Sequence, residues 1–398
     1  MTSEAAAALR ATVEDFHPGA SVSEVATRSG DVPFRGLPDL NRPRLLVPGA
    51  PGRAASRALL RFSVALSTRD AVSRIGAAAA IRVAGVGRVL PAGLAVRGGT
   101  ADDLSSHLAG QLGEPVVFGV GVGTARANRK PVLEVFSRRS GDTLAFAKVG
   151  DNPVASERVR AEATALGEIA GRLGPRFEVP ELISLTRWND HDVLLLTPLR
   201  TVPQFFAGRR VPTGLMRDFS ESFDAGSAPL VEAPQWRRMQ TAALPPAPVV
   251  DRWRELFDRL GNLAHDRPDL RVGAWHGDWT AWNMAWRGRR LQLWDFERFE
   301  TGVVRGLDAV HYPVNDVLLR KGLTAAAVLD GVARGTAALG NGEEADLIAA
   351  AYLVAITFRY LESVGQGGES LVAERTRVIL DALELWLEKL VVGGRGGR

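Results

Sequence analysis

The sequence predicts an α+β fold: a mixed α/β lobe followed by a mainly helical lobe, with an N-terminal extension packed on or near the mixed lobe. Three observations predict it. The chain has 398 residues, which is too long for one ordinary core and suggests two or three domains. Short apolar runs typical of strands gather between residues 116 and 196. After residue 251 the apolar positions recur with a helical period. We therefore expect the extension over 1–112, the mixed lobe over 113–199 and the helical lobe over 200–398.

The extension has two parts of different composition. Residues 1–43 are rich in Ala, Ser, Gly and Pro, and apart from a short helix after Thr2 we expect a loosely held segment. Residues 44–97 carry nine arginines against one acid, Asp70, and their apolar stretches fit two helices and a short strand. A capped helix is expected from about residue 100 to Gly113, with acids in its first turn.

In the mixed lobe the period changes to that of strands. Residues 116–118, 131–136 and 143–149 are predicted as three strands, separated by a Gly-rich stretch and by a polar turn. A long helix follows over 153–173, and the continuous apolar run 193–196 suits a central strand.

The last half is mainly helical. Residues 201–250 contain many prolines and are expected to be irregular, and a short β-like island at 271–298 interrupts the helices. The helices are predicted over 251–265, 308–320, 323–338, 343–363 and 369–391.

Composition excludes several classes of function. The chain has no cysteine, which removes disulfides, thiolate nucleophiles and cysteine-based metal centres. No two of its six histidines lie three to five residues apart, so no local histidine pair is offered to a transition metal. The longest uncharged apolar run has twelve residues, 347–358, which is too short for a membrane helix, and the N-terminus lacks the pattern of a secretory signal. We expect a soluble, cytoplasmic protein.

The β-like island carries the strongest chemical signal. The run His276-x-Asp278-x4-Asn283 places a carboxylate and an amide on one loop, and Asp295 follows at the end of an apolar strand. Phosphoryl transfer from a nucleotide uses a carboxylate that accepts a proton from the acceptor hydroxyl, together with oxygen ligands for Mg²⁺. The island therefore fits a phosphotransferase.

The mixed lobe supplies the other parts that such a reaction needs. Residues 119–124 (GVGVGT) lie between two strands, where backbone N–H groups could approach phosphates. Lys148 sits in an apolar strand, where an unpaired ammonium would be costly, and Glu162 on the following helix is a plausible partner. The glycine spacing does not fit a dinucleotide fingerprint, and a strand follows it instead of a helix, which argues against a Rossmann dehydrogenase.

On these motifs, residues 113–390 resemble the aminoglycoside phosphotransferase family, small-molecule kinases with a bilobal protein-kinase-like fold. The resemblance implies an enzyme that uses ATP and Mg²⁺ to transfer the γ-phosphate to a hydroxyl of a small molecule: a sugar, amino sugar, aminoglycoside or glycoconjugate. It implies Asp278 as the catalytic base, with His276 bracing the loop. It also implies Asn283 and Asp295 as Mg²⁺ ligands.

The same resemblance assigns the nucleotide-binding residues. Lys148 would contact the phosphates and Glu162 would orient Lys148. Gly121 and Gly123 would bring the backbone of the Gly-rich stretch to the phosphates. Residues 194–199, which include Leu196 and Leu199, would form the hinge that contacts adenine.

Several alternatives stay open. A kinase-like fold without activity, serving as a nucleotide-binding or scaffold protein, is the main rival. Trp279 and Trp282 flank the catalytic loop, where they could stack on substrate or pack the core. Acidic side chains at 218, 221 and 224 could favour a cationic acceptor or belong to a solvated loop. The basic segment 44–97 could dock on an anionic membrane surface or a protein partner, whereas no recognition motif supports nucleic acid.

Overall fold

The computed structural model describes residues 2–26, 32–37, 40, 45–121, 131–205, 212–364 and 369–395. The chain divides into two compact units. The sheet unit comprises Met1–Gly167, Arg176–Gly208 and Ala285–Glu297, and the helical unit comprises Glu168–Pro175, Arg209–Met284 and Arg298–Arg398. One unit is mixed and the other mainly helical, which is the α+β class that the sequence predicts.

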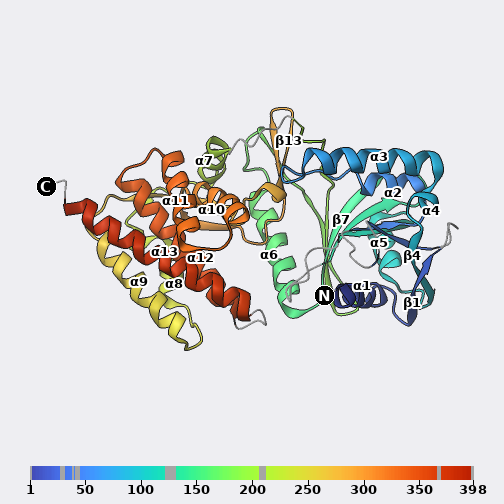
Figure 1. The fold of residues 1–398 in the computed structure, drawn as a ribbon, viewed down its shortest axis with the longest axis horizontal. Helices are drawn as coiled ribbons and strands as arrows, with labels where there is room; N and C mark the ends of the chain where they lie inside the picture. Colours follow the sequence, from blue (N-terminus) through green and yellow to red (C-terminus); the bar gives the residue numbers. More distant parts are fainter. Residues whose placement is uncertain are drawn as a thin grey trace. The chain divides into compact units, whose positions relative to one another are not determined.

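The sheet unit is built on one nine-stranded sheet in the order β1-β4-β2-β3-β5-β6-β7-β10-β9, and the strand pairs described in it are antiparallel. Strands β1, β4 and β7 of this sheet are labelled in Figure 1. The strands expected near 116–118, 131–136, 143–149 and 193–196 are confirmed as β5, β6, β7 and β10. In chain order the nine strands are β1 (Ala20–Ala26), β2 (Phe34–Leu37), β3 (Leu45–Pro48), β4 (Ala92–Gly98), β5 (Val116–Gly121), β6 (Val132–Ser137), β7 (Thr143–Gly150), β9 (Leu182–Trp188) and β10 (His191–Leu196).

Residues 1–112 contribute four strands to this sheet. Strand β3 pairs with β5 through Leu45 opposite Gly121, so the N-terminal strands continue the sheet formed by the rest of the unit. The expectation of a loosely held segment over 1–43 was wrong for its described residues, because helix α1 (Thr2–Asp15) buries Leu9 and Val13, and Phe16 follows in the same core. Burial of these apolar side chains stabilises the segment.

The two faces of the sheet are covered by different elements. Alternate residues of β7, among them Ala147 and Val149, lie in a core that also holds Leu9 of α1 and Leu108 of α5 (Leu104–Leu112). A second core joins Phe136 of β6 to α2 (Gly52–Ala58), α3 (Thr68–Ala84) and α4 (Val86–Val89). Side chains alternate between faces along a strand, so Lys148, between Ala147 and Val149, points away from the first core.

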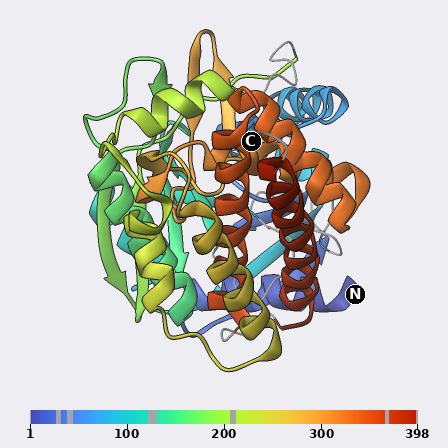
Figure 2. The ribbon, with the colours of Figure 1, turned by 90° about the vertical axis from the view of Figure 1, so that its left-hand side faces the viewer.

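The helical unit packs its long helices around one core. This unit is shown from another side in Figure 2. Its helices α12 and α13 pack against each other. Its helices are α7 (Thr213–Glu221), α8 (Pro234–Thr241), α9 (Pro248–Ala264), α10 (Leu307–Lys321), α11 (Ala325–Leu339), α12 (Glu343–Val364) and α13 (Glu369–Arg395). The five helices expected after residue 251 are confirmed as α9 to α13.

Residues 201–250 are more regular than expected. Helices α7 and α8 lie in this stretch, and Pro234 and Pro248 stand at the first turns of α8 and α9. A proline there is tolerated because the N–H that it lacks would have no partner within the helix. The prolines therefore mark where helices begin.

Two further short strand groups belong to the region of the β-like island. Strand β12 (Leu270–Trp275) pairs with β15 (Glu300–Val304), and β11 (Ser227–Ala228) pairs with β12. Strands β13 (Met284–Arg287), β14 (Arg290–Leu293) and β8 (Phe177–Glu178) form a separate small sheet. Among the described residues, none of the helices has the length and apolar character needed to cross a membrane.

Candidate active site

Lys148 lies at the centre of a buried cluster of charges in the sheet unit. Its ammonium donates to both carboxylate oxygens of Glu162, at 2.6 and 2.5 Å, and to Oδ1 of Asp295 at 2.7 Å. Lys148 is 5% exposed, and Glu162, on α6 (Pro153–Ile169), is fully buried. Burying an ammonium is costly unless charged partners contact it, and the two carboxylates are those partners.

Asp295 follows β14 in an unusual backbone conformation. Its φ is +72°, a region that side chains other than glycine seldom adopt. The next residue, Phe296, donates its backbone N–H to Oε1 of Glu162 at 3.3 Å. Glu162 therefore holds both the Lys148 ammonium and the backbone beside Asp295, which fixes where the Asp295 carboxylate points.

In the helical unit, the loop after β12 is held by one buried carboxylate. Asp308, near the start of α10, accepts the backbone N–H of His276 at 2.7 Å and that of Gly277 at 3.1 Å. Burial raises the pKa of the Asp308 carboxyl, and the nearby His276 and the two N–H donors oppose that rise. Asp308 is thus a structural brace for the loop.

His276 also braces this loop, and its ring is fully buried. Its Nδ1 lies 3.3 Å from the backbone nitrogen of Asp278 and accepts that N–H. The side chain of His276 thus contacts the backbone of Asp278, and this contact fits a positioning role.

The carboxylate of Asp278 is oriented from within the same loop. Nδ2 of Asn283 donates to Oδ2 of Asp278 at 2.9 Å and to its carbonyl oxygen at 3.0 Å. The Asp278 side chain is 35% exposed, and its Oδ1 lies 3.6 Å from Nε2 of His311 on α10. A carboxylate that is oriented on one side and open to solvent on the other can receive a proton from a bound hydroxyl.

Arg359 of α12 closes the loop from another side. Its guanidinium donates to the carbonyl oxygens of Gly277 and Arg298, both at 2.9 Å, and lies over the Trp275 ring at 3.7 Å. Burial lowers the pKa of Arg359 to about 10, and Glu300 opposes the shift. Gly277 has a φ of +79°, and a Cβ there would lie 2.2 Å from the Arg298 carbonyl oxygen, so this position requires glycine.

The residues proposed for Mg²⁺ fit that ion by the chemistry of their donors. Mg²⁺ prefers oxygen ligands and binds through one or two carboxylates plus waters and substrate phosphates. Asp295 offers a carboxylate. Asn283 uses its Nδ2 on Asp278, which leaves its amide oxygen as the donor for a metal. In the described part of the chain, no three or more His, Asp or Glu side chains come together as a metal site. A Mg²⁺ ion that is also bound by phosphates does not need such a group.

The structure places the other predicted nucleotide-binding residues as follows. Gly121 ends β5 and lies opposite Val132, which in turn lies opposite Lys148. Gly123 lies outside the described residues. Leu196 ends β10 and is 3% exposed, and Leu199 follows it and is partly buried.

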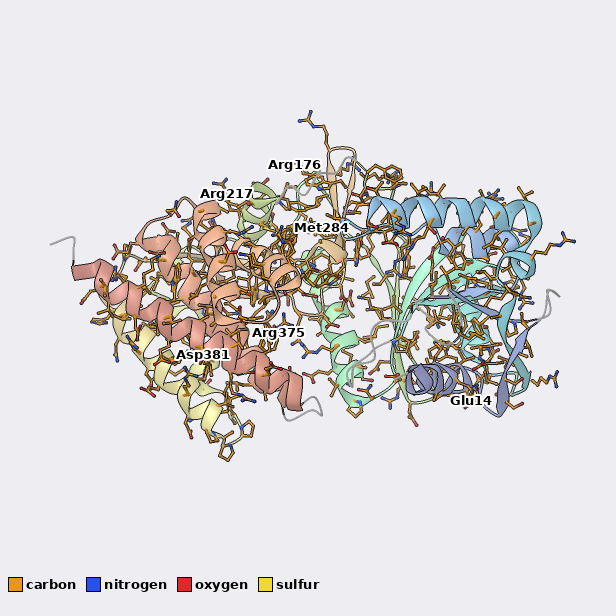
Figure 3. All side chains as sticks on the ribbon, in the orientation of Figure 1. Glu14, Arg176, Arg217, Met284, Arg375 and Asp381 are labelled. Atoms are coloured by element: carbon orange, nitrogen blue, oxygen red, sulfur yellow. The ribbon has the colours of Figure 1, made fainter. Side chains whose placement is uncertain are left out.

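The two tryptophans beside Asp278 differ. Trp279 is fully buried, and its ring meets Phe219 edge to face at 5.6 Å. A ring without exposed surface cannot stack on a substrate, so the assignment of Trp279 as a substrate residue is corrected to a core residue. Trp282 is 40% exposed and is available for contact with a ligand. Met284, labelled in Figure 3, begins β13 directly after this loop.

Two acidic residues of α7 and of the turn after it are paired with arginines. Arg305 lies 2.5 Å from Asp224 and 3.6 Å from Glu221, and Arg271 lies 3.0 Å from Asp224. These arginines neutralise two of the three acids. The acidity of this stretch therefore gives no support for a cationic acceptor.

Sequence reasoning missed three residues near these clusters. His311 and Arg359 surround the Asp278 loop, and Arg61 of the N-terminal segment lies over the ring of Phe146, 4.6 Å from its centre. All three come from segments far from the loop or strand that they contact. No local pattern distinguishes Arg61 from the other arginines of residues 44–97, so the sequence carried no signal for it.

Comparison with known proteins gives matches in structure alone. No protein-family model matches the sequence, and no curated protein sequence matches it. The structure is similar to that of aminoglycoside phosphotransferase APH(4)-Ia, with 12% identity and a TM-score of 0.47 over 73% of this chain and 99% of that one. It is also similar to a protein assigned as a fructosamine-3-kinase from Thermobifida fusca YX-ER1 (18% identity, TM-score 0.42, 73% and 100% of the two chains). A third similar structure is amicoumacin kinase hAmiN (13% identity, TM-score 0.38, 67% and 88%).

Proposed function

We propose that this protein is an ATP-dependent phosphotransferase that phosphorylates a hydroxyl group of a small molecule. The observation that carries the proposal is the arrangement at Asp278. Its carboxylate is oriented by Asn283 and remains open to solvent, on a loop that Asp308 and Arg359 hold rigid. The buried Lys148 cluster supports the nucleotide side of the reaction, because it supplies a positioned cation for phosphate oxygens.

The residues would act mainly by positioning. Asp278 orients the acceptor hydroxyl and receives its proton as the acceptor oxygen bonds to the γ-phosphorus. The bond between that phosphorus and the β–γ bridging oxygen breaks, and ADP leaves. Lys148 binds phosphate oxygens, and Glu162 holds Lys148 in place. Asp295 and Asn283 are the residues that would hold Mg²⁺, which when bound neutralises charge on the phosphates.

The proposal is tested by separating binding from turnover. Asp278→Asn preserves the size of the side chain and removes the proton acceptor. We expect turnover to fall about 10³-fold or more, while Mg·ATP binding, measured by calorimetry, stays within about twofold. A screen for ADP release over sugars, amino sugars, aminoglycosides and glycoconjugates would supply the acceptor for this assay.

Two outcomes would contradict the proposal. Full turnover in Asp278→Asn would show that this carboxylate is not the proton acceptor. Binding of Mg·ATP by the wild type without turnover of any acceptor would favour a silent nucleotide-binding or scaffold protein. Asp258→Asn, on the helix α9 of the same unit, is a matched control that should leave turnover unchanged.

A further inference from the structure

The N-terminal segment after α2 crosses the face of the sheet that carries Lys148. Directly opposite residues of an antiparallel pair share a face. Glu134 of β6 lies opposite Gly119 of β5 and opposite Phe146 of β7, and Phe146 is also opposite Leu196 of β10. Phe146 shares its face with Lys148, because the two residues are two positions apart on one strand.

Gly119, Glu134, Phe146 and Leu196 form a row across four neighbouring strands. Residues 58–62 lie along this row. A Cβ on Gly119 would lie 3.8 Å from Cβ of Ala58, so the end of α2 is next to the row at its β5 side. The guanidinium of Arg61 lies over the Phe146 ring at 4.6 Å. The backbone N–H of Phe62 then donates to Oγ1 of Thr201 at 3.0 Å, beyond the end of β10.

Arg61 is held in this position by its surroundings. Its carbonyl oxygen accepts a bond from Arg74 at 3.0 Å, which fixes the backbone. Burial lowers the pKa of Arg61, and the carboxylates of Glu134 and Asp295 oppose that shift. Arg61, Phe146 and Glu134 are each half-buried residues.

The surroundings of Lys148 leave one direction along β7 for a ligand. On the other side of Lys148, a Cβ on Gly150 would lie 2.6 Å from Cα of Ser156, so the backbone of α6 covers that position. Along this strand, a nucleotide with phosphates at Lys148 would place its nucleoside on the Phe146 side. Two residues along a strand span about 6.6 Å, which is comparable to the distance from a phosphate to a ribose or base.

We propose that Arg61 binds the nucleoside end of the nucleotide whose phosphates Lys148 binds, and that the N-terminal segment is thereby part of the nucleotide site. This inference rests on the proposed function. A guanidinium stacked on an aromatic ring presents a flat cationic surface to a base, and its N–H groups can donate to ribose or base oxygens. Glu134 beside it accepts a bond from Thr143 at 2.9 Å, and its carboxylate form attracts the Arg61 guanidinium.

The test compares Mg·ADP with Mg·pyrophosphate, which has no nucleoside. Binding of both to the full chain is measured by calorimetry for the wild type, Arg61→Ala, Arg61→Lys and Lys148→Ala. We expect Arg61→Ala to weaken ADP binding about 5- to 30-fold and to leave pyrophosphate binding within twofold. Arg61→Lys should be intermediate, because it keeps the charge without the planar group, and Lys148→Ala should weaken both ligands.

Control variants separate this role from effects on folding or on net charge. Arg82→Ala removes one exposed positive charge from α3 and should bind both ligands as the wild type does. If Arg61→Ala does not fold, Phe146→Leu removes the ring under Arg61 and should again weaken ADP alone. Thermal unfolding of each variant shows whether a change in binding accompanies a change in stability.

The outcomes distinguish this inference from the proposed function. Unchanged or tighter ADP binding by Arg61→Ala would overturn the inference, and tighter binding would show that Arg61 obstructs the site. An equal loss for ADP and pyrophosphate would overturn it as well, because Arg61 would then act on the phosphates. In these cases the proposed function survives if Lys148→Ala loses both ligands. A wild type that binds neither ligand would overturn both.

Discussion

The two clusters of candidate active-site residues are held in different ways. In the helical unit, the Asp278 loop is fixed through its backbone, by Asp308, Arg359 and the conformation of Gly277. In the sheet unit, Lys148 is fixed by charge, between Glu162 and Asp295. Backbone hydrogen bonds set the direction of a loop, whereas opposite charges set the position of an ammonium. The first cluster should therefore be sensitive to shape and the second to charge.

Gly277→Ala is expected to have the largest effect, because it changes the shape of the loop. The added Cβ would meet the Arg298 carbonyl oxygen and the Arg359 guanidinium in a conformation that already disfavours side chains. We expect a loss of about 3 kcal/mol or more in the free energy of unfolding, measured with urea, and loss of turnover.

Gly340→Ala is the matched control in the same unit. Gly340 also has a positive φ, +104°, but a Cβ there would meet no atom within 4 Å. It should cost only about 1 kcal/mol, from backbone conformation alone. Equal losses for the two variants would show that the contacts around Gly277 do not hold the loop.

Replacing one carboxylate by an amide in each cluster should affect kcat in one case and nucleotide affinity in the other. Asp308→Asn replaces one acceptor oxygen by an NH₂ group, so one of the two loop N–H groups loses its acceptor. We expect kcat to fall about 10- to 100-fold with little change in nucleotide affinity. Glu162→Gln removes charge from the Lys148 cluster, so we expect about 10-fold weaker nucleotide binding and a smaller change in kcat. Nucleotide affinity is measured by calorimetry and kcat by steady-state kinetics for both variants. The same changes in kcat and affinity for the two variants would contradict a difference between the clusters.

Glu134→Gln should have the smallest effect, and one that depends on pH. Burial raises the pKa of the Glu134 carboxyl to about 7, although Arg61 opposes this. The folded state therefore binds the proton more tightly than the unfolded state does, so the contribution of Glu134 to stability falls as the pH rises from about 4.5 to 7. Relative to the wild type, Glu134→Gln should gain about 1 kcal/mol between pH 6 and pH 7.5, measured by urea unfolding at both values. A difference that does not change with pH would contradict the raised pKa.

Much of the fold could be predicted from local pattern. Apolar residues recur with a clear period in the strands β5, β6, β7 and β10 and in the helices after residue 251. The period arises because these elements pack apolar side chains into a core. The placement of residues 1–112 could not be predicted. Their strands are short, and the pairing of β3 with β5 joins residues more than 70 positions apart, which local periodicity does not report.

The candidate site was predicted in part for similar reasons. The sequence order suggested Glu162 as the partner of Lys148, and the structure pairs the two side chains. Position on a loop suggested exposure for Trp279, yet Phe219 from α7 covers it. His311, Arg359 and Arg61 could not be found because each reaches its cluster through tertiary packing. Their roles, like those of Asp278, Asn283 and Asp295, are matters for the experiments above.

The pairing of β3 with β5 has a practical consequence for shortening the chain. A protein that began near residue 113 would lose every strand on one side of β5, so β5 would become an edge with unpaired N–H and C=O groups. It would also uncover the apolar residues that α1 and α5 now protect, among them Phe118 and Val120. Such a truncated protein should self-associate through β5, and fusion partners or tags are better attached before α1 than inserted at residue 113.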